Sequence, residues 1–191
     1  MTKGRLEAFS DGVIAIIITI MVLELRPPHA SELNALVPLA PKFSSYLMSF
    51  VYLGIYWNNH HHLIHAVKHV NGRVLWANLH LLFWLSLVPF VTAWMGENHF
   101  GSWPVFLYGT VLLLAAIAYF ILAHSLVSLH GRDSVIATAL GADFKGKLSI
   151  VIYAVAIPLA LFKWWLAFAI YWFVAIMWLI PDRRIERILQ Q

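Results

Sequence analysis

The sequence predicts an all-α integral membrane protein with six transmembrane helices in each subunit. Of its 191 residues, 61% are hydrophobic and 12% are charged, whereas soluble domains average about 25% charged residues. Several apolar stretches approach the ~20 residues that a helix needs to cross a bilayer. Polar residues gather in the short segments between these stretches. We therefore expect one six-span domain over residues 1–191, with little chain outside the membrane.

The first predicted span covers residues 5–25. It ends before Pro27 and Pro28, because proline cannot continue a helix. Beyond Asp11 the span carries one charge, at Glu24. The polar residues at its beginning lie within one or two helical turns of hydrocarbon, where polar groups are expensive unless they are paired. They need a structural or functional reason.

The other spans are separated by polar turns and by a connector over residues 132–147 that is too polar to insert. The apolar stretch 148–178 exceeds a ~30 Å core as a single helix, at about 1.5 Å per residue. We therefore divide it into two short spans that turn near Lys163. The five spans after the first are 43–67, 74–95, 104–129, 148–162 and 164–180, and residues 181–191 form a short amphipathic tail.

The distribution of Lys and Arg predicts the orientation in the membrane. An even number of spans places both termini on one side, together with the turn at 68–73 and the connector at 132–147. Ten of the 13 basic residues lie on that side, and the exceptions are Arg26, Lys42 and Lys163. By the positive-inside rule both termini are cytoplasmic, in a multi-pass protein of the plasma membrane. This bias also accounts for the net charge of +4, so no nucleic-acid partner is implied.

The first span has two different faces. At about 100° per residue, an apolar stripe with a single hydroxyl passes through Phe9 and Gly12 and continues deeper into the span. Asp11 lies on the opposite face with Glu7 near it, and its carboxylate needs donors on neighbouring helices. Periodicity alone favours lipid contact or core packing for the stripe, because apolar stripes are the rule in membrane spans. The deeper residues of the stripe are Ile16, Thr19, Ile20 and Leu23.

The motif Arg5-x-x-x-Phe9-Ser10-Asp11-Gly12, followed by an Ile- and Thr-rich span, resembles the signature of the transmembrane protein 175 family of potassium channels. These channels occur in lysosomes and, as versions with a single six-span repeat, in bacteria. The six-span plan supports the resemblance. Weaker similarities are Trp57-x-x-His60-His61 in the second span, and Trp76-x-Asn78 and Pro89-Phe90 in the third.

The resemblance implies a symmetric oligomer, a homotetramer, whose first helices line a pore. Residues five and eight positions after the motif's Asp are at the constriction, which here are Ile16 and Thr19, with Leu23 one turn further and Ile20 between them. The motif residues instead brace the first helix against the second and third. Arg5, Phe9, Ser10 and Asp11 are the matching residues, and Trp57, His60, Trp76 and Asn78 are their expected partners.

Such a pore predicts a potassium-permeable cation channel with a hydrophobic constriction. The sequence holds no TVGYG-type filter, so a ring of backbone carbonyls is not expected. Rings of Ile16 and Leu23 would form an apolar neck that loses its water when narrow and conducts when widened. Potassium sheds water more easily than sodium, which predicts modest selectivity. The expected partners are potassium ions, the bilayer and further copies of the chain, with no cofactor.

The histidines support an alternative, a secondary transporter or a metal- or haem-binding membrane protein. His61, His65 and His69 follow one another at i, i+4 and i+8, a spacing that suits a transition metal. His80 and His124 lie deeper and are candidate haem ligands. The histidines near the end of the second span could also titrate near neutral pH and tune the opening of a pore. An enzyme is not expected, because the chain has no nucleophile elbow, phosphate-binding glycine loop or paired intramembrane carboxylates.

Overall fold

The computed structural model describes residues 2–131, 133–141 and 143–179. Within these ranges the chain is all-helical and contains no strand. The elements, in order, are α1 (Lys3–Leu23), the 3-10 helix η1 (Leu33–Leu39), α2 (Ala40–His65), α3 (Gly72–Ser86), α4 (Val88–Glu97), α5 (Ser102–His130), α6 (Val135–Leu140), α7 (Phe144–Ala160) and α8 (Trp164–Leu179).

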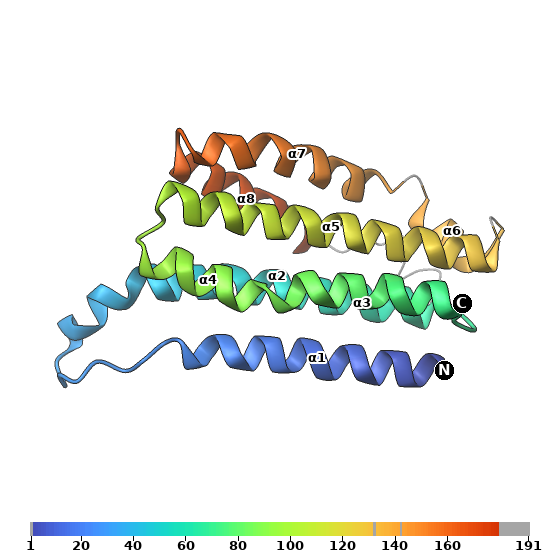
Figure 1. Ribbon diagram of the computed structural model, residues 1–191, viewed down its shortest axis with the longest axis horizontal. Helices are drawn as coiled ribbons and strands as arrows, with labels where there is room; N and C mark the ends of the chain where they lie inside the picture. Colours follow the sequence, from blue (N-terminus) through green and yellow to red (C-terminus); the bar gives the residue numbers. More distant parts are fainter. Residues whose placement is uncertain (1, 132, 142, 180–191) are drawn as a thin grey trace.

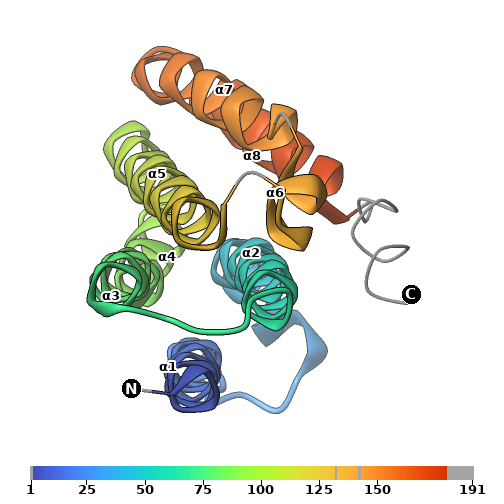
Figure 2. The ribbon, with the colours of Figure 1, turned by 90° about the vertical axis from the view of Figure 1, so that its right-hand side faces the viewer.

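The long helices run side by side along one axis (Figure 1). The beginning of α1, the 66–71 turn and residues 133–141 of the connector lie at one end of the bundle, which we name the amino end. Residues 24–39, 98–101 and 161–163 lie at the opposite end, the far end. Viewed along the axis, α2 separates α1 from α7 and α8, and α1 borders the bundle on one side (Figure 2). α1 packs only against α2, α3 and α4 among the pairs of elements with extensive contact in the described chain.

Three stretches are long and apolar enough to cross a membrane, judged by length and composition. They are α1, the combined stretch Gly72–Glu97 and α5, and α8 is a shorter apolar helix. α2 has 26 residues, but polar side chains from Asn58 to His62 interrupt its apolar character. The chain is therefore an all-helical, multi-pass membrane protein.

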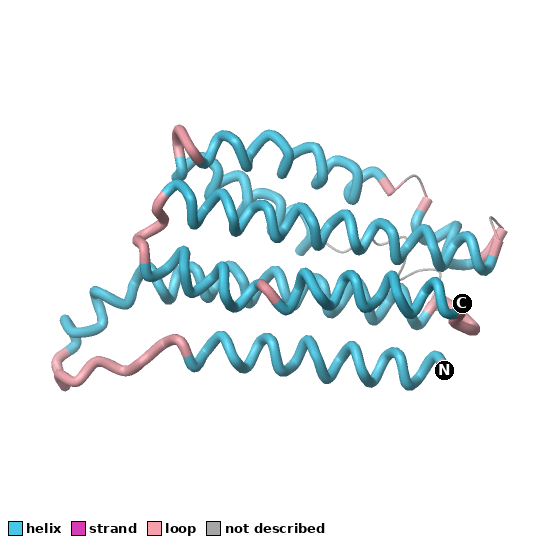
Figure 3. Tube along the Cα trace, in the orientation of Figure 1, coloured by secondary structure: helices cyan, strands magenta, loops and turns pink. Residues whose placement is uncertain are grey.

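The expected third span, 74–95, is two helices rather than one. α3 ends at Ser86 and α4 begins at Val88, and the break lies in mid-bundle (Figure 3). Pro89 has no backbone N–H to donate to the carbonyl four residues earlier, so the helical hydrogen-bond pattern is interrupted there. The N–H of Leu87 instead bonds the carbonyl of Trp84, three residues back.

The other boundaries differ by a few residues from the expected spans. α2 begins at Ala40 because Pro41 fits the first turn of a helix. α7 begins at Phe144, after Asp143 turns the chain with a φ of 45°. The polar connector contains the short helix α6, and the segment before α2 contains η1. The predicted tail, 181–191, lies outside the described residues.

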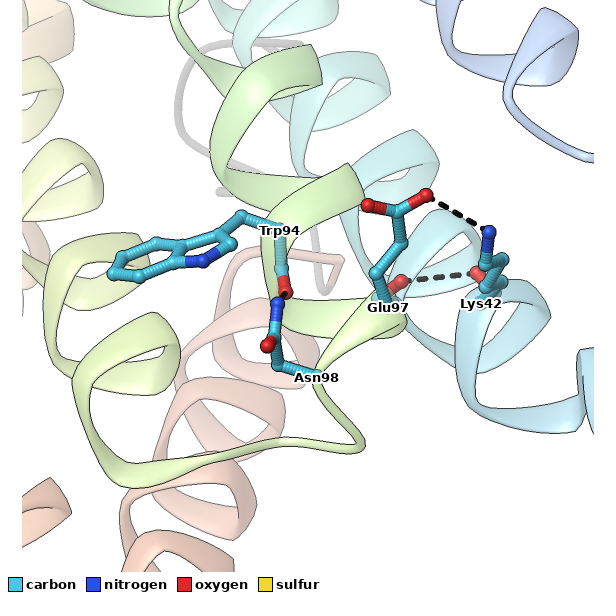
Figure 4. Close-up of polar contacts among 5 residues, drawn as sticks. Lys42, Trp94, Glu97 and Asn98 are labelled. Carbon is cyan, nitrogen blue, oxygen red and sulfur yellow. Dashed lines mark hydrogen bonds and ion pairs between the residues drawn. The ribbon is translucent and has the colours of Figure 1, made fainter.

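The far end of the bundle is held by a close approach of α2 and α4. A Cβ on Gly96 would lie 2.5 Å from Ser45 Oγ and 2.8 Å from the Cα of Lys42, so glycine allows the two helices to touch. Beside it, Lys42 Nζ is 2.9 Å from Glu97 Oε1 (Figure 4). This pair is partly exposed, and such pairs contribute about 0 to 1 kcal/mol.

Hydroxyl groups connect the helices inside the bundle. Ser49 Oγ is 2.6 Å from Thr92 Oγ1 and 3.0 Å from the hydroxyl of Tyr108, joining α2, α4 and α5. The hydroxyl of Tyr153 donates to that of Tyr52 across 3.0 Å, and Tyr52 donates to the carbonyl of Tyr171. Each buried hydroxyl thereby finds a partner where water is excluded.

Candidate functional site

The buried face of α1 is a regular stripe of five residues that faces α2, α3 and α4. Its apolar members contribute packing, and Ser10 is the one polar member. The stripe consists of Leu6, Ser10, Ile14, Ile17 and Met21.

The opposite face of α1 is open in the single chain. The side chains that the sequence predicts for the pore lie on this face, and Ile16 and Leu23 are 58% and 73% exposed. Ile20 and Thr19 are exposed as well. The Thr19 hydroxyl donates to the carbonyls of Ile16 and Ala15, at 2.9 and 3.0 Å. The lone pairs of the Thr19 oxygen are left available to groups outside the helix.

A buried hydrogen-bond chain ties α1 to α3 and α2. The Nδ2 of Asn78 donates to Ser10 Oγ across 2.9 Å, and Ser10 donates to the Leu6 carbonyl. Asn78 Oδ1 lies 2.7 Å from His60 Nε2, so that nitrogen carries the proton in this bond. All three side chains are at most 1% exposed. His60 Nδ1 is the one buried side-chain nitrogen or oxygen among the described residues that has no partner.

A second set of contacts joins α1 to α2 as a ladder, which we name the α1–α2 ladder. Trp57 Nε1 donates to Asp11 Oδ1 across 3.1 Å. One turn toward the amino end, His61 Nδ1 is 3.2 Å from Glu7 Oε1. A turn further, Lys3 Nζ donates to the carbonyl of His65 at 2.9 Å.

The ladder follows from helical spacing. Lys3, Glu7 and Asp11 are four residues apart on α1, and Trp57, His61 and His65 have the same spacing on α2. Because the two helices are antiparallel, residues i and i+4 on one meet residues j and j−4 on the other. Glu7 was placed near Asp11 by the sequence, but its contact with His61, and the role of Lys3, were not predicted. The repeated i+4 spacing of charged and aromatic residues is the signal that could have found them.

Other residues of the motif do not join these contacts. Arg5 is exposed and has no hydrogen bond or ion pair with any described residue. Trp76 is 75% exposed, and Phe9 is 49% exposed on the same side of α1 as the open stripe. The structure thus brings together Ser10, Asn78 and His60, and separately Asp11 and Trp57. It leaves Arg5, Phe9 and Trp76 at the surface of the single chain.

The three histidines proposed as metal ligands do not share a helix face, and this expectation is wrong. α2 ends at His65, so His69 lies in the following turn, where its ring packs against His130 with centroids 4.7 Å apart. His80 accepts a hydrogen bond from Trp84, and His124 bonds the Phe120 carbonyl, each within its own helix. Within the described ranges, no cluster of three or more His, Cys, Asp or Glu side chains could hold a metal ion.

Comparison with known proteins adds to this geometry. The profile of the family described as "Endosomal/lysosomal potassium channel TMEM175" matches residues 5–89. A protein of Chryseobacterium sp. (strain P1-3) named a potassium channel is 53% identical over 191 residues, covering 100% of both chains. The human "Endosomal/lysosomal proton channel TMEM175" is 34% identical over 96 residues, which are 44% of this chain and 19% of that protein.

A solved structure is similar over almost the whole fold. It is titled the crystal structure of a lysosomal potassium-selective channel TMEM175 homolog from Chamaesiphon minutus. The TM-score is 0.79 at 29% sequence identity, over 93% of this chain and 96% of that one. The motif at the beginning of α1, the helical fold and the relative of equal length all indicate the same family. The chain belongs to the TMEM175 family.

Proposed function

We propose that this protein is a potassium-permeable channel of the plasma membrane, a homotetramer whose pore is lined by α1. The observation that carries the proposal is the asymmetry of α1. One face is joined to α3 by a buried hydrogen bond and to α2 by the more exposed α1–α2 ladder. The other face presents Ile16, Thr19, Ile20 and Leu23, which the described part of the chain leaves exposed. A single α1 cannot surround an ion, so the proposal requires a closed ring of subunits.

The names of the relatives support potassium as the permeant ion. The full-length bacterial relative is named a potassium channel, and the solved structure is titled potassium-selective. Lipid is the alternative cover for the open stripe of α1. The polar ladder fixes the rotation of α1 and keeps the stripe on the side away from the subunit core. The channel names of the relatives favour a pore over lipid as the cover of that stripe.

The proposed topology has six spans with both termini cytoplasmic. The pair α3 and α4 serves as one span, and α1, α2, α5, α7 and α8 are the others. The amino end of the bundle carries Lys3, Arg5, Lys68, Arg73, Lys145 and Lys147, and the far end carries Arg26, Lys42 and Lys163. This asymmetry favours the amino end on the cytoplasmic side.

The proposed gate is an apolar neck. Ile16 and Leu23 are seven residues apart, or about 10 Å along α1, so their rings would bound a short dry segment. Thr19 supplies the side-chain oxygen between them. Ions pass when the neck widens enough to hold water, and the lower cost of dehydrating potassium gives it the advantage over sodium.

Flux from liposomes tests this proposal. We expect a small potassium flux from the wild-type protein and a much larger one from Ile16→Asn, since a polar ring keeps the neck wet. Val155→Asn is the matched control, because Val155 is similarly exposed, at 61% against 58% for Ile16, but lies on α7, away from α1. Sodium and proton flux are measured in parallel, because the vertebrate relatives are named proton channels. Equal flux from both variants, or no flux from any folded protein, would refute the pore assignment.

A further inference from the structure

Two exposed polar side chains lie at membrane depth on opposite sides of the subunit. They are Asn58 on α2 and His80 on α3. Asn58 lies seven residues before the end of α2 and His80 eight residues after the beginning of α3, which is about 10 and about 12 Å from the amino end of the bundle. Polar side chains at such a depth face protein or a water-filled space rather than lipid. Each of them therefore needs a partner.

The buried bond between His60 and Asn78 fixes the register of these two positions. His60 Nε2 and Asn78 Oδ1 are 2.7 Å apart, so the two residues share one depth. α2 and α3 are antiparallel, and Asn58 is two residues before His60 while His80 is two residues after Asn78. Asn58 and His80 therefore share a depth as well. Two residues turn a helix by about 200°, so both side chains point away from the buried bond, in opposite directions.

The two side chains have complementary hydrogen-bonding groups. His80 Nε2 accepts the indole N–H of Trp84 across 2.9 Å, so the neutral ring carries its proton on Nδ1. That N–H has no acceptor among the described residues. Asn58 makes no hydrogen bond with the described chain, so its carbonyl oxygen is free to accept one. Lipid chains satisfy neither group, and an unpaired polar group in an apolar medium costs free energy.

Apolar side chains surround each polar group. Leu79 and Phe83 are exposed beside His80 on α3, and Phe43 and Leu47 are exposed on the same side of α2 as Asn58. Such side chains would pack against lipid or against protein. The polar pair is therefore what distinguishes a neighbouring subunit from lipid, since polar side chains in membrane helices form hydrogen bonds across helix contacts.

A ring of subunits brings these two sides together. α2 and α3 lie on either side of α1 when the bundle is viewed along its axis (Figure 2). With α1 facing the axis of the ring, the outer side of α2 in one subunit meets the outer side of α3 in the next. Rotation about an axis along the membrane normal leaves the depth of every residue unchanged, so Asn58 arrives at the level of His80.

We propose that the subunits dock through these two sides, with His80 Nδ1 of each subunit donating a hydrogen bond to Asn58 Oδ1 of its neighbour. This contact rests on the channel ring proposed above and specifies how its subunits meet. Because the contact joins two different sides, each subunit uses both of them, and the ring closes with no free side.

Cross-linking tests the contact. The sequence has no cysteine, so introduced cysteines are the only thiols in the protein. Asn58→Cys and His80→Cys are combined in one chain, and the protein is reconstituted in liposomes and treated with a short apolar bismethanethiosulfonate. The two positions lie on opposite sides of their own subunit, so a link forms only between subunits. We expect covalent dimers, trimers and tetramers on denaturing gels, whereas each single variant should remain monomeric.

A matched pair of cysteines controls for random encounters. Val151→Cys combined with His80→Cys should remain monomeric, because Val151 is 60% exposed and about 10 Å along α7 but lies away from the outer side of α2. Equal linking by this pair would overturn the proposal. Glutaraldehyde, which links lysines, reports the ring itself. Glutaraldehyde tetramers without any link from the Asn58 and His80 pair would overturn the docking contact and leave the channel proposal standing, whereas glutaraldehyde monomers would overturn both.

Leucine replacements distinguish a subunit contact from a contact with lipid. Under lipid contact, Asn58→Leu would leave the tetramer unchanged or more stable. Under the proposed contact, we expect the tetramer to dissociate in detergent at protein concentrations at least about threefold higher. The double variant with His80→Leu should lose less than the sum of the two single losses. Val151→Leu is the control and should dissociate as the wild type does, and equal dissociation of Asn58→Leu and wild type would overturn the proposal.

Discussion

Trp57 on α2 donates its indole N–H to the carboxylate of Asp11 on α1, across 3.1 Å. This bond is the last rung of the α1–α2 ladder, whose other rungs join Glu7 to His61 and Lys3 to the His65 carbonyl. Beyond Asp11, the side-chain hydrogen bonds of α1 within the described chain stay inside the helix, at Thr19. α1 is therefore fixed at the amino end by polar contacts and held along the rest of its length by apolar packing.

The bond between Trp57 and Asp11 predicts a measurable coupling. Trp57→Phe keeps an aromatic ring but loses the donor, and Asp11→Asn keeps the shape but loses the charge. Each should lower the free energy of unfolding by about 1 kcal/mol, and the double variant should lose less than the sum. Thermal unfolding in detergent measures the stability of the wild type, the two single variants and the double variant. Trp76→Phe, at a 75% exposed indole, should change nothing, and additive losses would show that the bond contributes no coupling.

The buried chain from Ser10 through Asn78 to His60 predicts a larger loss. Asn78→Leu is close in size, but it removes the acceptor of His60 Nε2 and one of the two partners of Ser10 Oγ. We expect a loss of about 2 to 4 kcal/mol, because the buried imidazole N–H then keeps its desolvation penalty and the buried network is broken. Unfolding in detergent provides the measurement. Asn98→Leu, at an exposed residue after the end of α4 whose side chain bonds only the carbonyl of Trp94 (Figure 4), should lose far less. Similar losses in the two variants would contradict the role of the buried chain.

Helical periodicity was enough to separate the two faces of α1. Ile16 and Leu23 are exposed, and Asp11 points to a partner on α2, because a span with one polar cluster has an unambiguous angular pattern. The contact of Ser10 with Asn78 depends on the packing of α3, which helical periodicity does not give; the sequence placed it only through the resemblance to a known family.

Two features could not be read from the sequence, for different physical reasons. The stretch 148–178 is apolar on all sides, so its pattern assigns no inward face, and the convergence of Tyr52, Tyr153 and Tyr171 depends on how three helices pack. The second feature is the place of His69. The turn at 68–73 was predicted, and α2 ends at His65, within two residues of the predicted end of the span. The i+8 spacing alone does not show that His69 lies beyond that end, off the helix face of His61 and His65.

Substitution by alanine should have opposite effects at two glycines, Gly96 at the contact between α2 and α4 and Gly54 away from it. Gly96→Ala places a methyl group against Ser45 and the backbone of Lys42, so the helices must separate, at about 1 to 3 kcal/mol. Gly54→Ala, on α2, meets nothing within 4 Å. It should stabilise the protein by about 0.5 to 1 kcal/mol, since alanine loses less backbone freedom in a helix. Melting temperatures in detergent compare the pair, and a neutral Gly96→Ala would contradict the close contact.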